Sequence, residues 1–272
     1  MIRSARLHLL GLFLIGGLTS AFGQQPAPAE PAAQRQPVTP IPPLTDEDRA
    51  AAFPDLKGHP THEGKLNYYV LFDQLEWRKG NGEKTASWDN IGWIGGDISR
   101  LWFRTEGEAD RDAVTHAEGH LLYGRSFSRW WDFVEGIRQD VRPGPAQTWG
   151  AVGIQGLAPN FFEVQATAYV GASWHTQARL EAEYELLVTN SLILQPRAEI
   201  NMAGKSDPRR GVGSGLTTAE AGLRLRYEFR REFAPYIGVA WDHKFGGTAD
   251  FARTQGDAIR GTRFVAGVRV WF

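Results

Sequence analysis

Two histidines and a glutamate occupy alternate positions in the middle of the chain: His116, Glu118 and His120. In an extended strand, alternate side chains point to the same face, with successive Cβ atoms on that face roughly 6.5–7 Å apart. Two imidazoles and a carboxylate in this arrangement could hold Cu(II) or Zn(II), provided that a neighbouring strand adds a ligand. The same residues also suit a hydrated polar wall without a metal, and the sequence alone favours that simpler interpretation.

Two further histidines lie nearer the amino terminus. His59 and His62 stand beside Glu63 in a stretch that is rich in Pro, Ala and Gln. This composition supplies almost nothing for a packed core, so an extended or disordered segment is expected. A transient contact with a metal ion is one interpretation of the two histidines, and an ordinary polar leader is the simpler one.

Other chemistries find little support in the sequence. The chain has no cysteine, which excludes a disulfide framework and a thiolate metal site. Glu183 and Glu185 are expected to face arginines, an arrangement that suits salt bridges better than acid–base catalysis. No serine–histidine pair lies firmly on one apolar strand face, and no phosphate-binding glycine loop with a lysine is present. We therefore expect no enzymatic activity, and the formal net charge of −1 gives no indication of nucleic-acid binding.

The stretch 176–202 shows which elements must position these side chains. Polar residues stand at every second position from Gln177 to Glu185, with apolar residues between them, and the alternation resumes after a break at 189–191. A period of two predicts extended strands. The polar face would meet water in a soluble sandwich, or line a lumen if the apolar face meets lipid.

The amino terminus predicts export. Arg3, Arg6 and His8 precede a short apolar run over 9–18, and small residues at 21 and 23 follow it. This pattern is typical of a signal peptide, here residues 1–23. Residues 24–64 form the Pro- and Ala-rich periplasmic segment, and residues 65–272 remain for one all-β domain.

Twelve stretches of this domain can form strands. They are residues 65–78, 83–94, 97–108, 113–127, 130–142, 148–157, 161–173, 176–188, 192–202, 217–230, 233–245 and 261–272. The connections alternate between short turns and generally longer polar loops, above all 203–215 and 246–260, which is typical of an outer-membrane barrel with short periplasmic turns. An even strand number requires the weak stretch 83–94, so we expect twelve strands, with ten as the alternative.

The charge pattern favours a lumen over a soluble core. Residues 217–230 carry five ionisable side chains on one face, and an arginine facing hydrocarbon near the bilayer midplane would cost about 2–4 kcal/mol. Facing inward, these side chains can pair across a polar lumen, while a closed barrel leaves no unpaired strand edge in lipid. The last strand ends on an aromatic residue, Phe272, as the sorting signal of outer-membrane barrels does. The sequence thus predicts a transmembrane antiparallel β-barrel in contact with outer-membrane lipid.

Several phrases of the sequence resemble the copper-resistance protein B family of Gram-negative outer-membrane proteins. The longest is GLRLRYEFRREFAPYIG at 222–238, and the others lie at 73–76, 93–97, 153–159, 192–197, 246–250 and 267–272. The resemblance runs from about residue 65 to residue 272. It implies a role in copper tolerance, by binding copper ions or passing them across the outer membrane, with periplasmic copper-handling proteins as partners.

One feature departs from this family. Its members often carry a segment rich in Met and His before the barrel, whereas this chain has two methionines, the initiator and Met202. High-capacity copper storage before the barrel is therefore not expected. A small general porin or structural barrel without a specific metal role is the alternative function.

Overall fold

The computed structural model describes residues 43–52, 65–80 and 82–272, and the chain divides into two compact units, Met1–His59 and Pro60–Phe272. The described part of the first unit is helix α1 (Asp46–Ala52), none of whose residues is buried. Thr45 and Asp48 form a reciprocal cap at its start, since the Thr45 amide donates to the Asp48 carboxylate at 2.9 Å and the Asp48 amide to the Thr45 hydroxyl at 3.2 Å. The predicted signal peptide lies outside the described residues.

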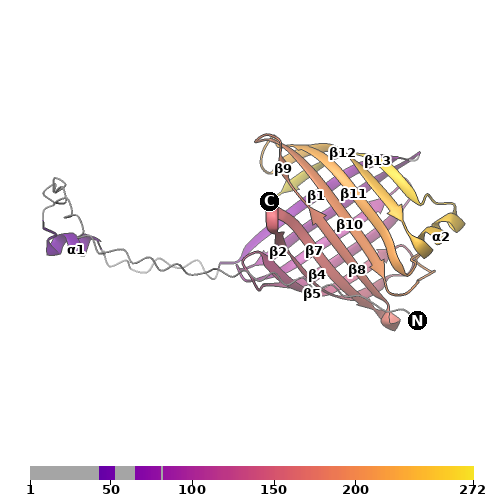
Figure 1. The fold of residues 1–272 in the computed structure, drawn as a ribbon, viewed down its shortest axis with the longest axis horizontal. Helices are drawn as coiled ribbons and strands as arrows, with labels where there is room; N and C mark the ends of the chain where they lie inside the picture. Colours follow the sequence, from indigo (N-terminus) through magenta and orange to yellow (C-terminus); the bar gives the residue numbers. More distant parts are fainter. Residues whose placement is uncertain (1–42, 53–64, 81) are drawn as a thin grey trace, which may run out of the picture. The chain divides into compact units, whose positions relative to one another are not determined.

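The second unit is a barrel of antiparallel strands (Figure 1). Its strands are β1 (Asn67–Gly80), β2 (Glu83–Gly95), β3 (Ser99–Ala109), β4 (Val114–Ser126), β5 (Trp131–Arg142), β6 (Gln147–Ala158), β7 (Phe162–Gly171), β8 (Thr176–Glu183), β9 (Leu186–Leu187), β10 (Leu192–Ala203), β11 (Gly215–Tyr227), β12 (Phe233–Lys244) and β13 (Arg260–Trp271). Strand β9 continues β8 after a break of two residues, and both pair with β10. The wall therefore contains twelve strands in sequence order.

Pairing between the first and last strands closes the barrel. Residues of β1 pair with β13, and at the rim the Val70 amide donates to the Phe272 carbonyl at 3.1 Å while the Phe272 amide donates back at 2.9 Å. The prediction of a twelve-strand transmembrane barrel is confirmed. The weak stretch at 83–94 is a full strand, because its neighbours β1 and β3 hydrogen-bond it on both sides.

The two faces of the wall differ in polarity as the alternation predicts. Charged side chains such as Glu76, Arg224 and Arg226 are buried inside, whereas large apolar side chains such as Phe103 and Ile137 are exposed on the outside. This inversion of a soluble protein's pattern suits an interior filled by polar contacts and an exterior in lipid. One apolar cluster lies inside the barrel, on β4 to β7: Leu122, Val134, Trp149, Ala151 and Tyr169.

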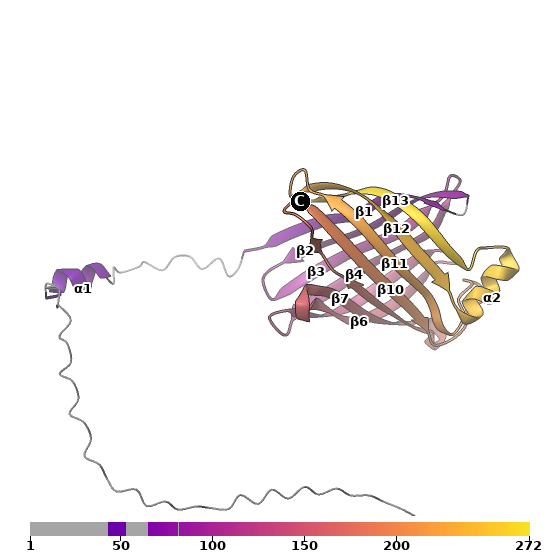
Figure 2. The same cartoon turned by 45° about the horizontal axis from the view of Figure 1, so that its top comes forward.

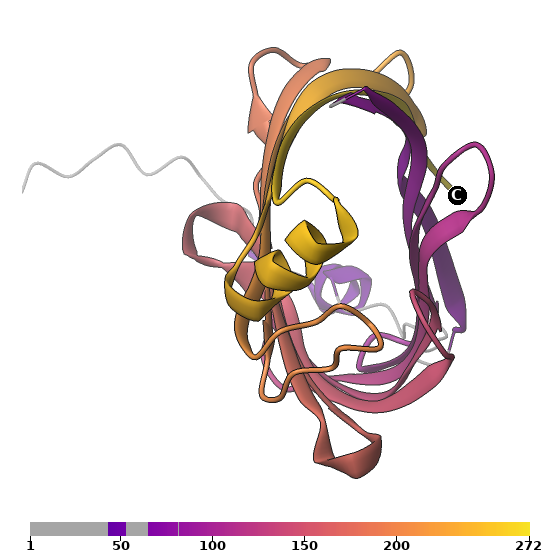
Figure 3. The same cartoon turned by 90° about the vertical axis from the view of Figure 1, so that its right-hand side faces the viewer.

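The two rims of the barrel also differ. One carries the short turns and the carboxyl end of β13, and the other carries the two longest connections, 204–214 and 245–259 (Figure 2). The expectation of a loop throughout 246–260 is wrong in one respect, because this segment contains helix α2 (Gly246–Gln255). Figure 3 shows α2 over one side of the barrel mouth. Its residues Thr248, Ala249 and Ala252 are buried. Within the described residues, neither helix has the length and apolarity needed to cross a membrane.

Candidate metal site at the waist of the lumen

Three cavities follow one another through the lumen. A small one of about 110 Å³, here called the waist, lies between a long-loop vestibule of about 530 Å³ and a short-turn vestibule of about 600 Å³. Glu118 and Arg179 line both the waist and the long-loop vestibule. Glu163 and Arg269 line both the waist and the short-turn vestibule. The waist is therefore the smallest of these three cavities and lies between the two vestibules.

The waist carries more acidic than basic side chains. Its lining includes seven carboxylates and four guanidinium groups: Asp73, Asp89, Glu106, Glu118, Glu163, Glu181 and Glu183 against Arg104, Arg179, Arg197 and Arg269. With all of them ionised, carboxylates exceed guanidinium groups by three (7 − 4). A cavity of one excess sign with low-dielectric walls concentrates ions of the opposite sign. In that ionisation state the waist would favour cations.

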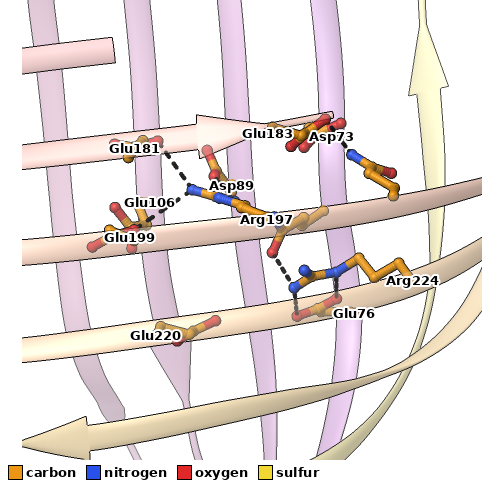
Figure 4. A network of polar contacts seen from close by, with 12 residues as sticks. Asp73, Glu76, Asp89, Glu106, Glu181, Glu183, Arg197, Glu199, Glu220 and Arg224 are labelled. Atoms are coloured by element: carbon orange, nitrogen blue, oxygen red, sulfur yellow. Dashed lines mark hydrogen bonds and ion pairs between the residues drawn. The ribbon is translucent and has the colours of Figure 1, made fainter. Parts of the chain in front are cut away.

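Arginines of β8 and β10 bridge the waist to the opposite wall. Arg197 Nη1 on β10 lies 2.7 Å from Asp89 Oδ2 on β2, and its Nη2 lies 3.2 Å from Glu181 Oε2 (Figure 4). Arg179 Nη1 on β8 lies 2.8 Å from Glu106 Oε2 on β3. Strand β10 is five positions from β2 around the barrel, and β8 is five positions from β3. The Arg197–Asp89 and Arg179–Glu106 ion pairs therefore cross the lumen, whereas the Arg197–Glu181 pair joins adjacent strands.

In the predicted metal site, Glu118 contacts both histidines, but only His116 joins it in the set of converging ligand atoms. The Glu118 carboxylate lies between the two histidines, with Oε1 2.9 Å from His120 Nε2 and Oε2 3.6 Å from His116 Nε2. His116 lines the long-loop vestibule and His120 lines the waist. The two histidines therefore face different cavities of the lumen. Metal binding by these residues stays a prediction.

A neighbouring strand supplies the further ligand that the site requires. Glu106 on β3 pairs directly with Glu118 on β4. Ligand atoms of Glu106, His116 and Glu118 all lie within 4.8 Å of one another. His120 is 8% exposed, and its Nδ1 is buried without a hydrogen-bond partner among the described residues. We call Glu106, His116, Glu118 and His120 the waist group.

Sequence reasoning did not single out Glu106, or Arg179 as its partner. The alternation of side chains along a strand places Glu106 on the same face as Arg104, and Arg179 on the same face as Glu181. This alternation shows which face of its strand a residue lies on, but not which residues contact each other across the barrel. The other predicted ligands, His59 and His62, lie outside the described residues.

Comparison with known proteins places this barrel in a family. The model of the copper resistance protein B precursor family (CopB) matches residues 66–272. The chain belongs to the copper resistance protein B family. It is 48% identical to a copper resistance protein B homolog of Pseudomonas syringae pv. tomato over 256 residues, covering 94% of this chain and 87% of that protein. It is 50% identical to copper resistance protein B of Escherichia coli over 234 residues, covering 86% of this chain and 79% of that protein.

Solved structures with a similar fold include outer-membrane porins. The NanC porin superposes with a TM-score of 0.49 at 12% identity, covering 75% of this chain and 99% of that one. The KdgM porin gives 0.44 at 10% identity, with the same coverage.

The waist group suits the metal that the copper resistance protein B family name implies. Imidazole nitrogens and carboxylate oxygens are suitable ligands for Cu(II), which favours tetragonal sites of such donors. The same family membership confirms the resemblance in the sequence and supports a role in copper resistance.

Proposed function

We propose that this barrel contributes to copper tolerance by binding copper ions at the waist group and passing them through its lumen. Family membership supports the copper role. The proposed site rests on one observation: ligand atoms of Glu106, His116 and Glu118 lie within 4.8 Å of one another, and His116 and Glu118 line the long-loop vestibule. The excess of carboxylates around the waist would draw a cation from either vestibule.

The proposed setting is the outer membrane of a Gram-negative bacterium. Short turns face the periplasm in outer-membrane barrels, so the short-turn vestibule would open there. Copper would then be exchanged with periplasmic copper-handling proteins on that side. The segment 24–64, with His59 and His62, would lie in the same compartment after removal of residues 1–23.

We propose transport or sequestration instead of catalysis as the role of the lumen. Five of the seven carboxylates that line the waist are engaged by arginines, as Glu181 is by Arg197 at 3.2 Å. A carboxylate held in an ion pair is a poor general base, because its charge is already compensated.

A general porin is the competing function, and the ion pairs that cross the lumen argue against it. The waist cavity of about 110 Å³ is small beside the roughly 300–1,000 Å³ of sites that take drug-sized molecules. A route of this width suits an ion with few waters better than a sugar or a peptide.

Calorimetric titration tests the proposal. The barrel, refolded in detergent, is titrated with Cu(I) and Cu(II), and the His116→Ala/His120→Ala double variant is titrated in parallel. We expect saturable binding that the double variant loses. A His175→Ala/His243→Ala variant is the matched control, since neither of these histidines belongs to the waist group, and it should bind as the parent does. Absence of saturable binding, together with unchanged copper sensitivity of cells on deletion, would leave the porin or structural barrel.

A further inference from the structure

The side chain of Arg179 already holds a position that a cation would take in the waist group. Its Nη1 lies 2.8 Å from Glu106 Oε2 and 2.7 Å from Glu118 Oε1, and its Nη2 donates to Glu118 Oε2 at 3.2 Å. Glu106 and Glu118 are also two of the three residues whose ligand atoms converge. A metal ion bound to these carboxylates would meet the positive charge of Arg179 at the same oxygens. Binding of the metal therefore requires that the guanidinium move away.

Arg179 has a second set of partners on β10. Its Nε donates to Asn201 Oδ1 at 3.0 Å and lies 3.6 Å from Glu199 Oε1. Glu199 is also approached by Arg197, whose Nη2 lies 3.6 Å from Oε2, and its Oε1 accepts a hydrogen bond from Asn201 Nδ2 at 2.6 Å, so Arg179 would share Oε1 with that amide. The Arg179 side chain is only 10% exposed, so leaving it without a carboxylate partner would destabilise the barrel. A shift of the guanidinium toward Glu199 keeps it paired.

A second observation marks the waist group as a site for a ligand. His120 is buried, and its Nδ1 has no hydrogen-bond partner in the described part of the chain. Its Nε2 is engaged by Glu118 at 2.9 Å. Release of Glu118 from Arg179 would change the environment of both imidazoles at once.

We propose that Arg179 is a resident counter-ion that competes with divalent cations for Glu106 and Glu118 and moves to Glu199 when a cation binds. This inference rests on the proposed function, in that it takes the waist group as the copper site. Arg179 is a positioning residue that sets the affinity of the site and does not ligate the metal. Competition of this kind keeps binding weak enough for release, as conduction through a pore requires. It fits passage of copper better than permanent storage.

The test compares two arginine variants of the full chain, refolded in detergent and titrated with Cu(II) and with Zn(II). Arg179→Gln removes the competitor, and Arg269→Gln is the matched control. The control also removes one positive charge from the waist, but Arg269 pairs with Asp73 and Glu185 and has no ion pair with Glu106, Glu118 or Glu199 in the described structure. We expect Arg179→Gln to bind Cu(II) about tenfold more tightly than the parent, with a much smaller gain for Arg269→Gln.

Thermal unfolding adds a readout that a purely structural role of Arg179 would not produce. Without metal, Arg179→Gln should unfold at a lower temperature than the parent, because two carboxylates lose their partner. Added Cu(II) should restore its unfolding temperature more than it raises that of the parent. If Cu(II) no longer raises the unfolding temperature of the Arg179→Gln/His116→Ala double variant, the metal binds at the waist group.

The outcomes separate the two proposals. If the parent binds copper through His116 but Arg179→Gln binds no more tightly, or Arg269→Gln gains equally, the competition is refuted while the copper site stands. If neither the parent nor any variant binds copper in a way that depends on His116, the proposed function fails and the competition fails with it.

Discussion

Glu163 and Glu183 stand directly opposite each other on β7 and β8, and both line the waist. Within the described residues, neither carboxylate has a cationic group within 4 Å, and Glu183 accepts a hydrogen bond from Gln195 Nε2. Like charges at directly opposed positions of a sheet repel each other. The strands tolerate this repulsion although neighbouring carboxylates of the same wall are paired with arginines.

Neutralising one member of this pair should stabilise the barrel. At a pH at which both carboxylates are ionised, Glu183→Gln keeps an oxygen for Gln195 and removes the repulsion, so the free energy of unfolding should rise by about 0.5 kcal/mol in a urea titration. Glu181→Gln is the matched control two residues away. It loses the ion pair with Arg197 and should lower the free energy of unfolding by about 1–3 kcal/mol. Equal effects of the two variants would contradict the repulsion.

The bridge from Arg197 to Asp89 should limit ion conduction. Arg197→Gln removes the 2.7 Å ion pair that crosses the lumen and should raise single-channel conductance in planar bilayers about twofold or more, since pore width and lining charge govern passage. Arg231→Gln is the control, because Arg231 is exposed at the short-turn rim and its ion pair among the described residues is with Glu228. Unchanged conductance in Arg197→Gln would show that the waist is not the limiting constriction.

Glu76 should be a main determinant of stability. Its side chain is fully buried, accepts hydrogen bonds from Arg78 at 2.7 Å and Arg224 at 3.0 Å, and accepts one from the Tyr236 hydroxyl at 3.0 Å. Glu76→Gln would leave two buried arginines short of a negative charge and should lower the free energy of unfolding by about 3–5 kcal/mol. Glu83→Gln, at an exposed position on β2, should change it by less than about 0.5 kcal/mol.

Gly213 should hold α2 against the mouth of the barrel. A Cβ at this position would lie 2.4 Å from the backbone nitrogen of Thr248, and the Gly213 amide donates to the Thr248 hydroxyl at 2.8 Å. Gly213→Ala should displace α2 at a cost of about 1–3 kcal/mol, so that trypsin cleaves after Arg253 about tenfold faster than in the parent. In Gly96→Ala a Cβ meets nothing within 4 Å, and cleavage should stay at the parental rate.

The sequence predicts the strands and their lumen-facing residues better than it predicts which of these residues pair with one another. Alternation places each side chain inside or outside because the period of a strand is fixed, and His116, Glu118 and His120 share the interior as expected. The meeting of Arg179 with Glu106 depends on barrel closure and strand stagger, which join residues 73 positions apart. Helix α2 escapes prediction because it starts with two glycines and has no side-chain cap, so its packing on the mouth must hold it.

The last strand in the sequence closes the barrel. Strand β13 hydrogen-bonds β12 on one side and β1 on the other, and the backbone of Phe272 is bonded to Val70. A nascent polypeptide that stops short of this strand would expose two bare edges, which hydrocarbon cannot satisfy. Closure of the barrel in a bilayer therefore depends on β13, because only a molecule that contains this strand satisfies both edges.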